Sequence, residues 1–245
     1  MILDSHICLI ASGATGQALT HDLDCSVWAF RGPEGWLVFD TGAGVDTGAM
    51  LERMAFCGIA AGDVAAVLLT HAHADHSGGA AALMAKLPRA RLLSGAETAR
   101  ILAGRDERLI SLDKARGHFY PLDYEWTPPE VDEVLAPAQA HRLAGLEVTL
   151  LETPGHSADH CCYRVRGDGI DALVAGDAVF AGGRVILQDI EDCSVSASIA
   201  SIRKLAGLDF ESFFAGHGGF SLRGGRRHVE AAMVHAGAGL PPPQL

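Results

Sequence analysis

Short apolar runs separated by glycine-rich turns recur along the chain and predict a fold that mixes strands with helices. Residues 25–40 hold two such runs around a Gly-Pro-Glu-Gly segment, which is typical of a β-hairpin, and we expect this hairpin to open the fold. Further strand-like runs occur in five segments, 64–70, 91–94, 146–156, 161–177 and 201–219. A Gly-Asp-Gly turn within 161–177 predicts a second hairpin.

Apolar residues at helical spacing lie between several of these runs. They predict helices over 45–57 with Gly58 as C-cap, over 77–87 with Ser77 as N-cap, near 97–102, and over 226–237. The resulting strand–helix–strand order favours a sheet whose ligands bind beyond the carboxyl ends of the strands. We expect the final Pro-Pro-Pro-Gln-Leu to be frayed.

The segment 95–130 breaks this rhythm, because it is rich in aromatic residues and proline. A chain of 245 residues fits one large domain, so we expect a single domain over 1–245 in which 95–130 forms an inserted cap. Four aromatic residues in the cap either contact a substrate or anchor the loop: Phe119, Tyr120, Tyr124 and Trp126.

Composition and charge limit the partners. The formal net charge of -11 disfavours nucleic acid and anionic membranes, so a small-molecule substrate is expected. None of the six cysteines forms a CxxC pair, and no run of the chain is long and apolar enough for a transmembrane helix. The N-terminal run follows an aspartate rather than basic residues. We therefore expect reduced cysteines and a cytoplasmic protein, with a homodimer left open.

Titratable side chains cluster directly after the strand predicted at 64–70. His71, His73, Asp75 and His76 occupy four of six positions. Imidazole nitrogens and carboxylate oxygens are the donors that zinc prefers among such residues, and alternation in an extended loop turns His71 and His73 to one side. Four ligands cannot complete two metal sites, so others are expected from distant strand ends.

Three more candidates each follow an apolar strand-like run: His156 in "TPGHS", Asp177 in "AGDAVF" and His217 in "AGHGG". With these three residues there are enough ligands for two metal ions. One metal would take His71, His73 and His156, the other would take Asp75, His76 and His217, and Asp177 would bridge the two.

The motifs "THAHADH", "TPGH", "GD" and "GHG" occur in this order and resemble the metallo-β-lactamase superfamily from Asp40 to about His217. The resemblance implies an αββα sandwich of two mixed sheets between helices, in the α/β (α+β) class. It also implies a dinuclear site at one edge of the sandwich, usually with two Zn²⁺, and places Asp40 of "DTG" in support of the ligand loop. Iron or manganese is the alternative metal.

The expected activity is hydrolysis of a small ester, lactone, thioester or amide. Two cations about 3.5–4 Å apart can ionise a bridging water and polarise a carbonyl, while Asp75 orients the hydroxide or passes its proton on. A phosphodiesterase of a small substrate and an iron-dependent redox protein are the alternatives. The motifs resemble most the lactonase and glyoxalase II-like branches, each with one departure: Phe180 stands where the lactonases have tyrosine, and the chain ends soon after His217.

Other polar residues are expected to have lesser roles. His160 is expected to form a supporting hydrogen bond rather than to bind metal, and no cysteine is expected to act as a nucleophile. We expect Asp189, Glu191 and Asp192 to lie in a solvated loop. Six histidines are given no catalytic role: His6, His21, His118, His141, His228 and His235.

Overall fold

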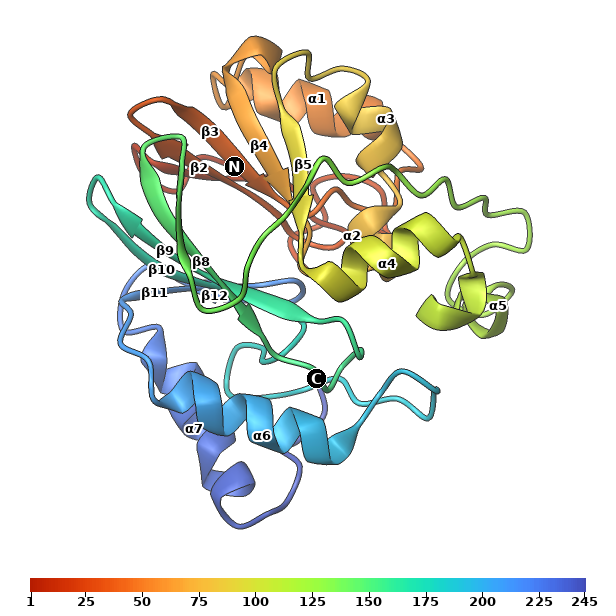
Figure 1. The fold of residues 1–245 in the computed structure, drawn as a ribbon, viewed down its shortest axis with the longest axis vertical. Coiled ribbons are helices and arrows are strands. Elements are labelled where there is room, and N and C mark those ends of the chain that lie inside the picture. Colours follow the sequence, from red (N-terminus) through yellow and green to blue (C-terminus); the bar gives the residue numbers. More distant parts are fainter.

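Two six-stranded sheets face each other in the computed structural model, which describes residues 1–245 (Figure 1). The first sheet has the order β1-β2-β3-β4-β5-β6. Its strands are β1 (Ile7–Ala11), β2 (Val27–Gly32), β3 (Gly35–Phe39), β4 (Val64–Leu68), β5 (Arg91–Ser94) and β6 (Glu133–Val134). The pairs β1–β2 and β2–β3 are antiparallel, whereas β3 to β6 are parallel.

The second sheet has the order β12-β11-β10-β9-β8-β7. Its strands are β7 (Ala140–Leu143), β8 (Leu146–Glu152), β9 (Cys161–Gly167), β10 (Ile170–Gly176), β11 (Ser212–Ala215) and β12 (Phe220–Ser221). Only β10 and β11 are parallel. The predicted hairpin between β9 and β10 is confirmed, and its turn residues Asp168 and Gly169 both have positive φ, as a type I′ turn requires.

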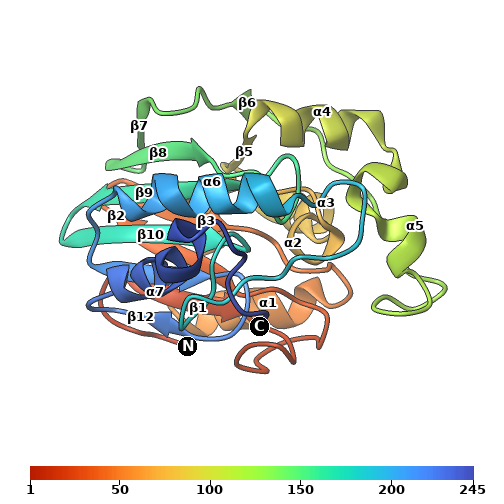
Figure 2. The ribbon, with the colours of Figure 1, turned by 90° about the horizontal axis from the view of Figure 1, so that it is seen from below.

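The helices cover the outer faces of the sheets. They are α1 (Thr47–Phe56), α2 (Ala74–Ser77), α3 (Ala80–Met84), α4 (Ala96–Gly104), α5 (Leu112–Ala115), α6 (Val195–Ala206) and α7 (Arg226–Gly237), with single 3₁₀ turns η1 (Ala61–Asp63) and η2 (Glu107–Ile110). Seen from below, α6 and α7 lie over the second sheet (Figure 2).

Three apolar layers hold this arrangement together, because each sheet buries both faces. Met54 of α1 and Leu83 of α3 pack against the outer face of the first sheet, and Ile202 of α6 packs against the second. Between the sheets the ring centroids of Phe30 and Phe214 lie 5.1 Å apart. The αββα sandwich expected from the sequence is confirmed.

Three sequence expectations about elements are wrong. The 25–40 hairpin does not open the fold, because β1 precedes it. In place of one helix over 77–87, α2 ends at Ser77 and α3 spans only Ala80–Met84. Ser77 is not an N-cap but donates a hydrogen bond to the carbonyl of Ala72. Gly78 and Gly79 separate α2 from α3, and the 41–44 loop approaches both glycines closely. A Cβ on Gly79 would lie 2.2 Å from the Thr41 carbonyl oxygen, so only glycine fits there.

The C-terminal tail is not frayed. The amide of Val185 donates to the carbonyl of Pro243, and the amide of Leu245 donates to the carbonyl of Val185. A third hydrogen bond joins the Leu187 amide to the Gln244 side chain. These bonds tie the tail to the loop that follows β10.

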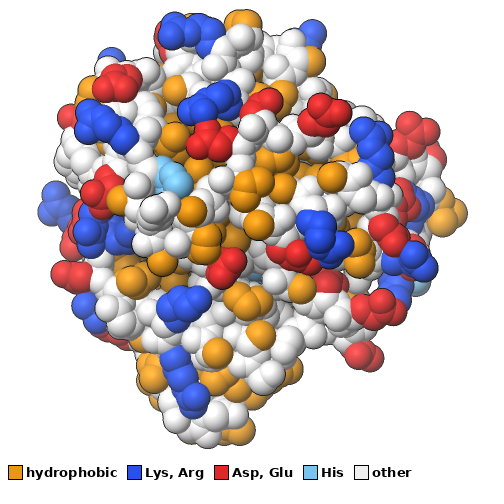
Figure 3. All heavy atoms as spheres, in the orientation of Figure 1, with side chains coloured by type: hydrophobic (Ala, Val, Ile, Leu, Met, Phe, Trp, Pro, Cys, Tyr) orange, Lys and Arg blue, Asp and Glu red, His pale blue; other side chains and the backbone are white.

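The surface face seen in Figure 3 carries acidic and basic side chains intermixed, without a continuous basic patch. None of the helices combines the length and the apolar character that crossing a bilayer requires.

Candidate metal centre

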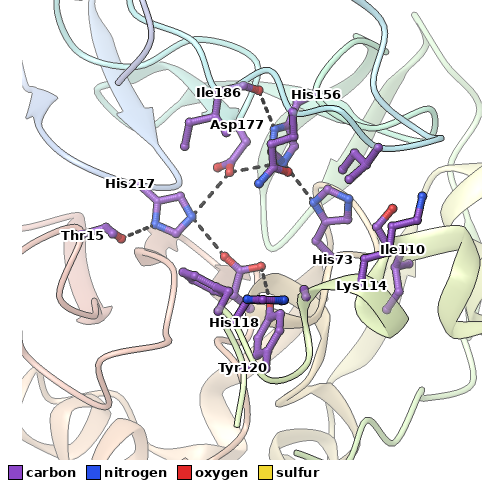
Figure 4. Close-up of a pocket in the computed structure, with 16 residues that line it drawn as sticks. Thr15, His73, Ile110, Lys114, His118, Tyr120, His156, Asp177, Ile186 and His217 are labelled. Carbon is purple, nitrogen blue, oxygen red and sulfur yellow. Dashed lines mark hydrogen bonds and ion pairs between the residues drawn. The ribbon is translucent and has the colours of Figure 1, made fainter. Parts of the chain in front are cut away.

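The candidate ligands come together at one edge of the sandwich because the strands that precede them end there. His71 and His73 follow β4, and Asp75 and His76 lie in α2. His156 follows β8, Asp177 follows β10 directly, and His217 follows β11. The structure thus brings all seven side chains into one cluster, four from the first sheet and three from the second. Four of them, His73, His156, Asp177 and His217, are labelled in Figure 4.

One half of the cluster consists of three imidazoles, those of His71, His73 and His156. Their donor atoms lie within 4.8 Å of one another, and Nδ1 of His73 is 3.0 Å from Nε2 of His156. All three side chains are buried. This is a donor set that can hold one metal ion.

The other half consists of Asp75, His76 and His217. Oδ2 of Asp75 lies 3.1 Å from Nε2 of His217 and 3.6 Å from Nε2 of His76. These three residues form a second group that can hold a metal ion.

Asp177 lies between the two groups. Its Oδ1 is 3.4 Å from Nε2 of His76, and its Oδ2 is 3.4 Å from Nε2 of His217 and 3.6 Å from Nε2 of His156. One carboxylate therefore reaches histidines of both groups, as a bridging ligand would need to.

The outward nitrogen of each imidazole has an oxygen partner. His76 Nδ1 donates to Asp40, His217 Nδ1 donates to the Thr15 hydroxyl, and His156 Nδ1 donates to the carbonyl of Ile186. In addition, His71 Nδ1 donates to the Thr70 hydroxyl over 3.0 Å, and His73 Nε2 donates to Asp192 over 2.8 Å. Such acceptors fix the tautomer and the orientation of metal-bound histidines.

The inward atoms, by contrast, include three that are buried without a hydrogen-bond partner: His71 Nε2, His76 Nε2 and Asp177 Oδ1. Buried polar atoms are nearly always paired, and three orphans in one cluster need an explanation. Cations held by the cluster would satisfy all three. The residues present therefore fit a metal centre.

The electrostatics of His71, His156 and Asp177 agree with this fit, whereas nearby anionic groups outweigh burial and raise the pKa of the other histidines, His73, His76 and His217. Burial lowers the pKa of His71 well below its ordinary value and that of His156 to about 4, so both imidazoles keep the lone pair that metal binding requires. Burial raises the pKa of Asp177, but the adjacent His217 and His76 lower it more, so the carboxyl is ionised.

Two supporting roles expected from the sequence are confirmed. Asp40 accepts hydrogen bonds from His76 and from the amide and hydroxyl of Thr70, which holds the loop of clustered histidines. His160 accepts from the amide of Asp177 through Nε2 and contacts the Thr153 hydroxyl through Nδ1, so it orients a candidate ligand and does not join the cluster.

A cavity of about 310 Å³ opens beside the cluster. Candidate ligands form its floor, and its walls come from 110–120 on one side and from 186–190 on the other. The apolar wall residues are Ile110, Ala115, Phe119, Ile186 and Ile190, and Lys114 and His118 add polar groups. His118, given no role from the sequence, thus lines the pocket.

The structure divides the aromatic residues whose position the sequence left open. Phe119 and Tyr120 line the cavity. Tyr124 and Trp126 anchor the segment instead, since they donate hydrogen bonds to the Ala43 carbonyl and the Ser77 hydroxyl. Phe180 lies fully buried in the layer under α6 and α7 and does not face the cavity.

Two residues at the site were missed or misjudged in the sequence. Thr15, in the loop between β1 and β2, had drawn no attention. The expectation of a solvated loop is wrong for Asp192, whose side chain is 9% exposed and contacts His73. Nothing in "LQDIEDCS" distinguishes it from Asp189 and Glu191 beside it, which are exposed. All six cysteines are free, as expected, and four of them are buried.

Comparison with known proteins gives this architecture a name. The family model described as the metallo-beta-lactamase superfamily matches residues 22–217, and the chain belongs to that superfamily. The structure is similar to that of a metallo-beta-lactamase family protein from Thermus thermophilus, with a TM-score of 0.72, 23% identity and coverage of 97% of this chain and 81% of the other. It is also similar to BJP-1, a subclass B3 metallo-beta-lactamase of Bradyrhizobium japonicum, with a TM-score of 0.69, 20% identity and coverage of 88% and 86%.

Curated relatives include a hydroxyacylglutathione hydrolase and a thioesterase. A hydroxyacylglutathione hydrolase of Glaesserella parasuis is 30% identical over 155 residues, which are 62% of this chain and 50% of the relative. An atrochrysone carboxyl ACP thioesterase of Aspergillus fumigatus is 27% identical over 155 residues, 63% of this chain and 38% of the relative. The chain thus spans half or less of the length of these relatives.

Proposed function

We propose that the protein is a hydrolase that uses two metal ions to cleave a small carbonyl substrate. The observation that carries this proposal is the set of seven buried donors from both sheets, three of them with orphaned atoms, beside a cavity of about 310 Å³. Pockets of roughly 300–1,000 Å³ suit small-molecule ligands.

Each ion would have its own ligands. His71 Nε2, His73 Nδ1 and His156 Nε2 would hold the first, Asp75 Oδ2, His76 Nε2 and His217 Nε2 would hold the second, and Asp177 would serve both. The nitrogen-rich donor set favours zinc, with iron or manganese as alternatives. When bound, the pair of ions lowers the pKa of a water molecule and polarises a carbonyl oxygen.

The protein's own groups would do the rest. Asp75 is the proposed catalytic residue: its Oδ2 faces the two histidines of its group, and its Oδ1 accepts a hydrogen bond from Tyr120. Because Asp75 also lines the cavity, it would accept a proton and pass it to a leaving group. The apolar side chains of 110–119 and 186–190 would surround the acyl part of the substrate and keep bulk water away. In this proposal the segment 95–130 is the cap of a single domain.

Among carbonyl substrates, thioesters and oxygen esters are the first to test. The relatives named as thioesterases and hydroxyacylglutathione hydrolases support this class. Lactones follow, but Phe180 cannot supply the hydrogen bond that tyrosine gives in lactonases, because its ring carries no hydroxyl and is fully buried.

The test combines metal analysis with a substrate panel. We expect the purified protein to contain close to two zinc ions per chain and to hydrolyse short acyl thioesters or esters, with activity lost on chelation and restored by added zinc. Iron with oxygen consumption instead of hydrolysis would overturn the proposal in favour of a redox protein. Turnover of phosphodiesters alone would overturn the carbonyl substrate.

A further inference from the structure

Asp192 connects two parts of the molecule that flank the cavity. Its Oδ2 accepts a hydrogen bond of 2.8 Å from Nε2 of His73, and its Oδ1 accepts one of 3.0 Å from the hydroxyl of Ser111. The carboxylate is 9% exposed and the His73 side chain 10% exposed, so water competes little for either bond. Charge-assisted hydrogen bonds of this kind are about twice as strong as neutral ones.

Asp192 and Ser111 belong to opposite walls of the cavity. Ser111 lies between η2 and α5, in the wall that Ile110 and Ala115 form, whereas Asp192 ends the loop that carries Ile186 and Ile190. Further out, Lys114 Nζ lies 3.6 Å from Glu191 Oε1, but both of these side chains are at least half exposed. The buried contact through Asp192 is therefore the stronger link between the walls.

The backbone at Ser111 supports a specific role for this contact. Ser111 has φ +53° and ψ +21°, a left-handed conformation that is costly for a residue other than glycine. The left-handed residue ends η2 and begins α5, and its hydroxyl points to Asp192 rather than capping the helix that it starts. The side chain of this strained residue makes a single, partly buried hydrogen bond, and strained residues of this kind cluster at functional sites.

We propose that Asp192 is a positioning residue that couples the metal centre to the wall of the pocket: one oxygen fixes the ring of His73, and the other fixes Ser111. The orientation of the His73 ring and the position of the pocket wall at Ser111 then depend on the same carboxylate. That the bound ion is zinc rests on the proposed function, but the measurements of zinc affinity and hydrogen–deuterium exchange described next need no substrate.

The first measurement is zinc affinity by competition with a chromophoric chelator. Asp192→Ala should weaken the site that contains His73 by about 10- to 100-fold, the usual effect of removing an acceptor behind a histidine ligand. Asp192→Asn keeps an oxygen for His73 and an amide for Ser111, so it should restore most of the affinity. Ser111→Ala should change zinc affinity less than about 3-fold, because the bond to His73 remains.

The second measurement is hydrogen–deuterium exchange of residues 107–116 in the zinc-loaded protein. Both Asp192→Ala and Ser111→Ala should speed exchange there, since each removes the buried link, whereas Asp192→Asn should not. Asp189→Ala is the matched control, because it removes an exposed carboxylate of the same loop that makes no hydrogen bond in the structure. It should change neither measurement.

Equal zinc affinity in Asp192→Ala and Asp189→Ala would overturn the role toward His73. Weakened affinity with unchanged exchange in both Asp192→Ala and Ser111→Ala would overturn the coupling. If Asp192→Ala fails to fold, Asp192→Ser replaces it in the affinity measurement, because its shorter side chain loses the bond to His73 and should weaken zinc binding in the same way, and Ser111→Ala still decides the exchange measurement. A protein that shows the expected zinc affinities but hydrolyses no substrate would refute the proposed function alone.

Discussion

The phenol of Tyr120 donates a hydrogen bond of 2.9 Å to Oδ1 of Asp75, and both side chains line the cavity. The bond leaves Oδ2 of Asp75 facing His217 and His76. The segment between β5 and β6 thus reaches the candidate catalytic carboxylate directly.

Replacing Tyr120 should therefore lower catalysis more than metal content. In Tyr120→Phe the carboxylate loses the partner that sets its orientation, and we expect kcat to fall about 10-fold with zinc content close to that of the wild type. Tyr124→Phe is the control, because that ring stacks on Tyr120 at 4.7 Å but its phenol bonds the Ala43 carbonyl. Equal losses in the two variants would contradict a specific role for Tyr120.

Asp177 should be needed for both ions. Its two oxygens face histidines of both groups, so Asp177→Ala is expected to reduce zinc from about two ions per chain to less than one, as elemental analysis would measure. Unchanged stoichiometry would show that it does not bridge. Asp22→Ala, which removes an exposed carboxylate far along the chain from these ligands, is expected to keep the full zinc content.

Thr15 should affect one ion selectively. Thr15→Val keeps the size of the side chain but removes the oxygen that lies 2.7 Å from Nδ1 of His217. We expect the affinity for one zinc per chain to fall about 10-fold while the other is retained. Thr20→Val, whose hydroxyl bonds the Ser12 amide instead, should leave both affinities unchanged.

The buried thiols should make the fold sensitive to alkali. Burial raises the pKa of Cys162 to about 12, whereas a thiol in the unfolded chain titrates near 8.5. The contribution of Cys162 to stability is fully present below the pKa of the unfolded thiol. It is lost as the pH rises toward the pKa of the folded thiol, because in this range only the unfolded chain releases the proton. Between pH 9 and 12 this one thiol should lower the free energy of unfolding by about 1.4 kcal/mol per pH unit.

Denaturant unfolding at a series of pH values measures this slope. In Cys162→Ala the slope of unfolding free energy against pH should be smaller by about 1.4 kcal/mol per pH unit. The variant should be less stable than the wild type near neutral pH, because the side chain is fully buried, and this difference should shrink as the pH rises above 9. An identical slope in wild type and variant would show that Cys162 titrates normally in the fold.

The sequence predicted the seven clustered residues because each lies just beyond an apolar strand, and strand ends that share an edge bring their next residues together. It could not predict Asp192 or Thr15. Their partners His73 and His217 lie 119 and 202 residues away along the chain, and neither belongs to a periodic pattern. Loop positions of this kind depend on the finished tertiary structure.

The boundaries that were wrong have the same origin. The sequence of 77–87 predicts one continuous helix, but the structure has a break between α2 and α3. The break lies at Gly78 and Gly79, against which the 41–44 loop packs. The tail 241–245 has the composition of a free end, yet it pairs with Val185. In both places a contact between distant segments overrides the local preference.

Both sheets contribute to the cluster, with His71 to His76 from the first and His156 to His217 from the second. During synthesis, a nascent chain therefore cannot assemble all seven donors until residue 217 has left the ribosome. Metal loading would then be a late event in maturation, and an ion retained through purification would report that the amino- and carboxyl-terminal halves have docked.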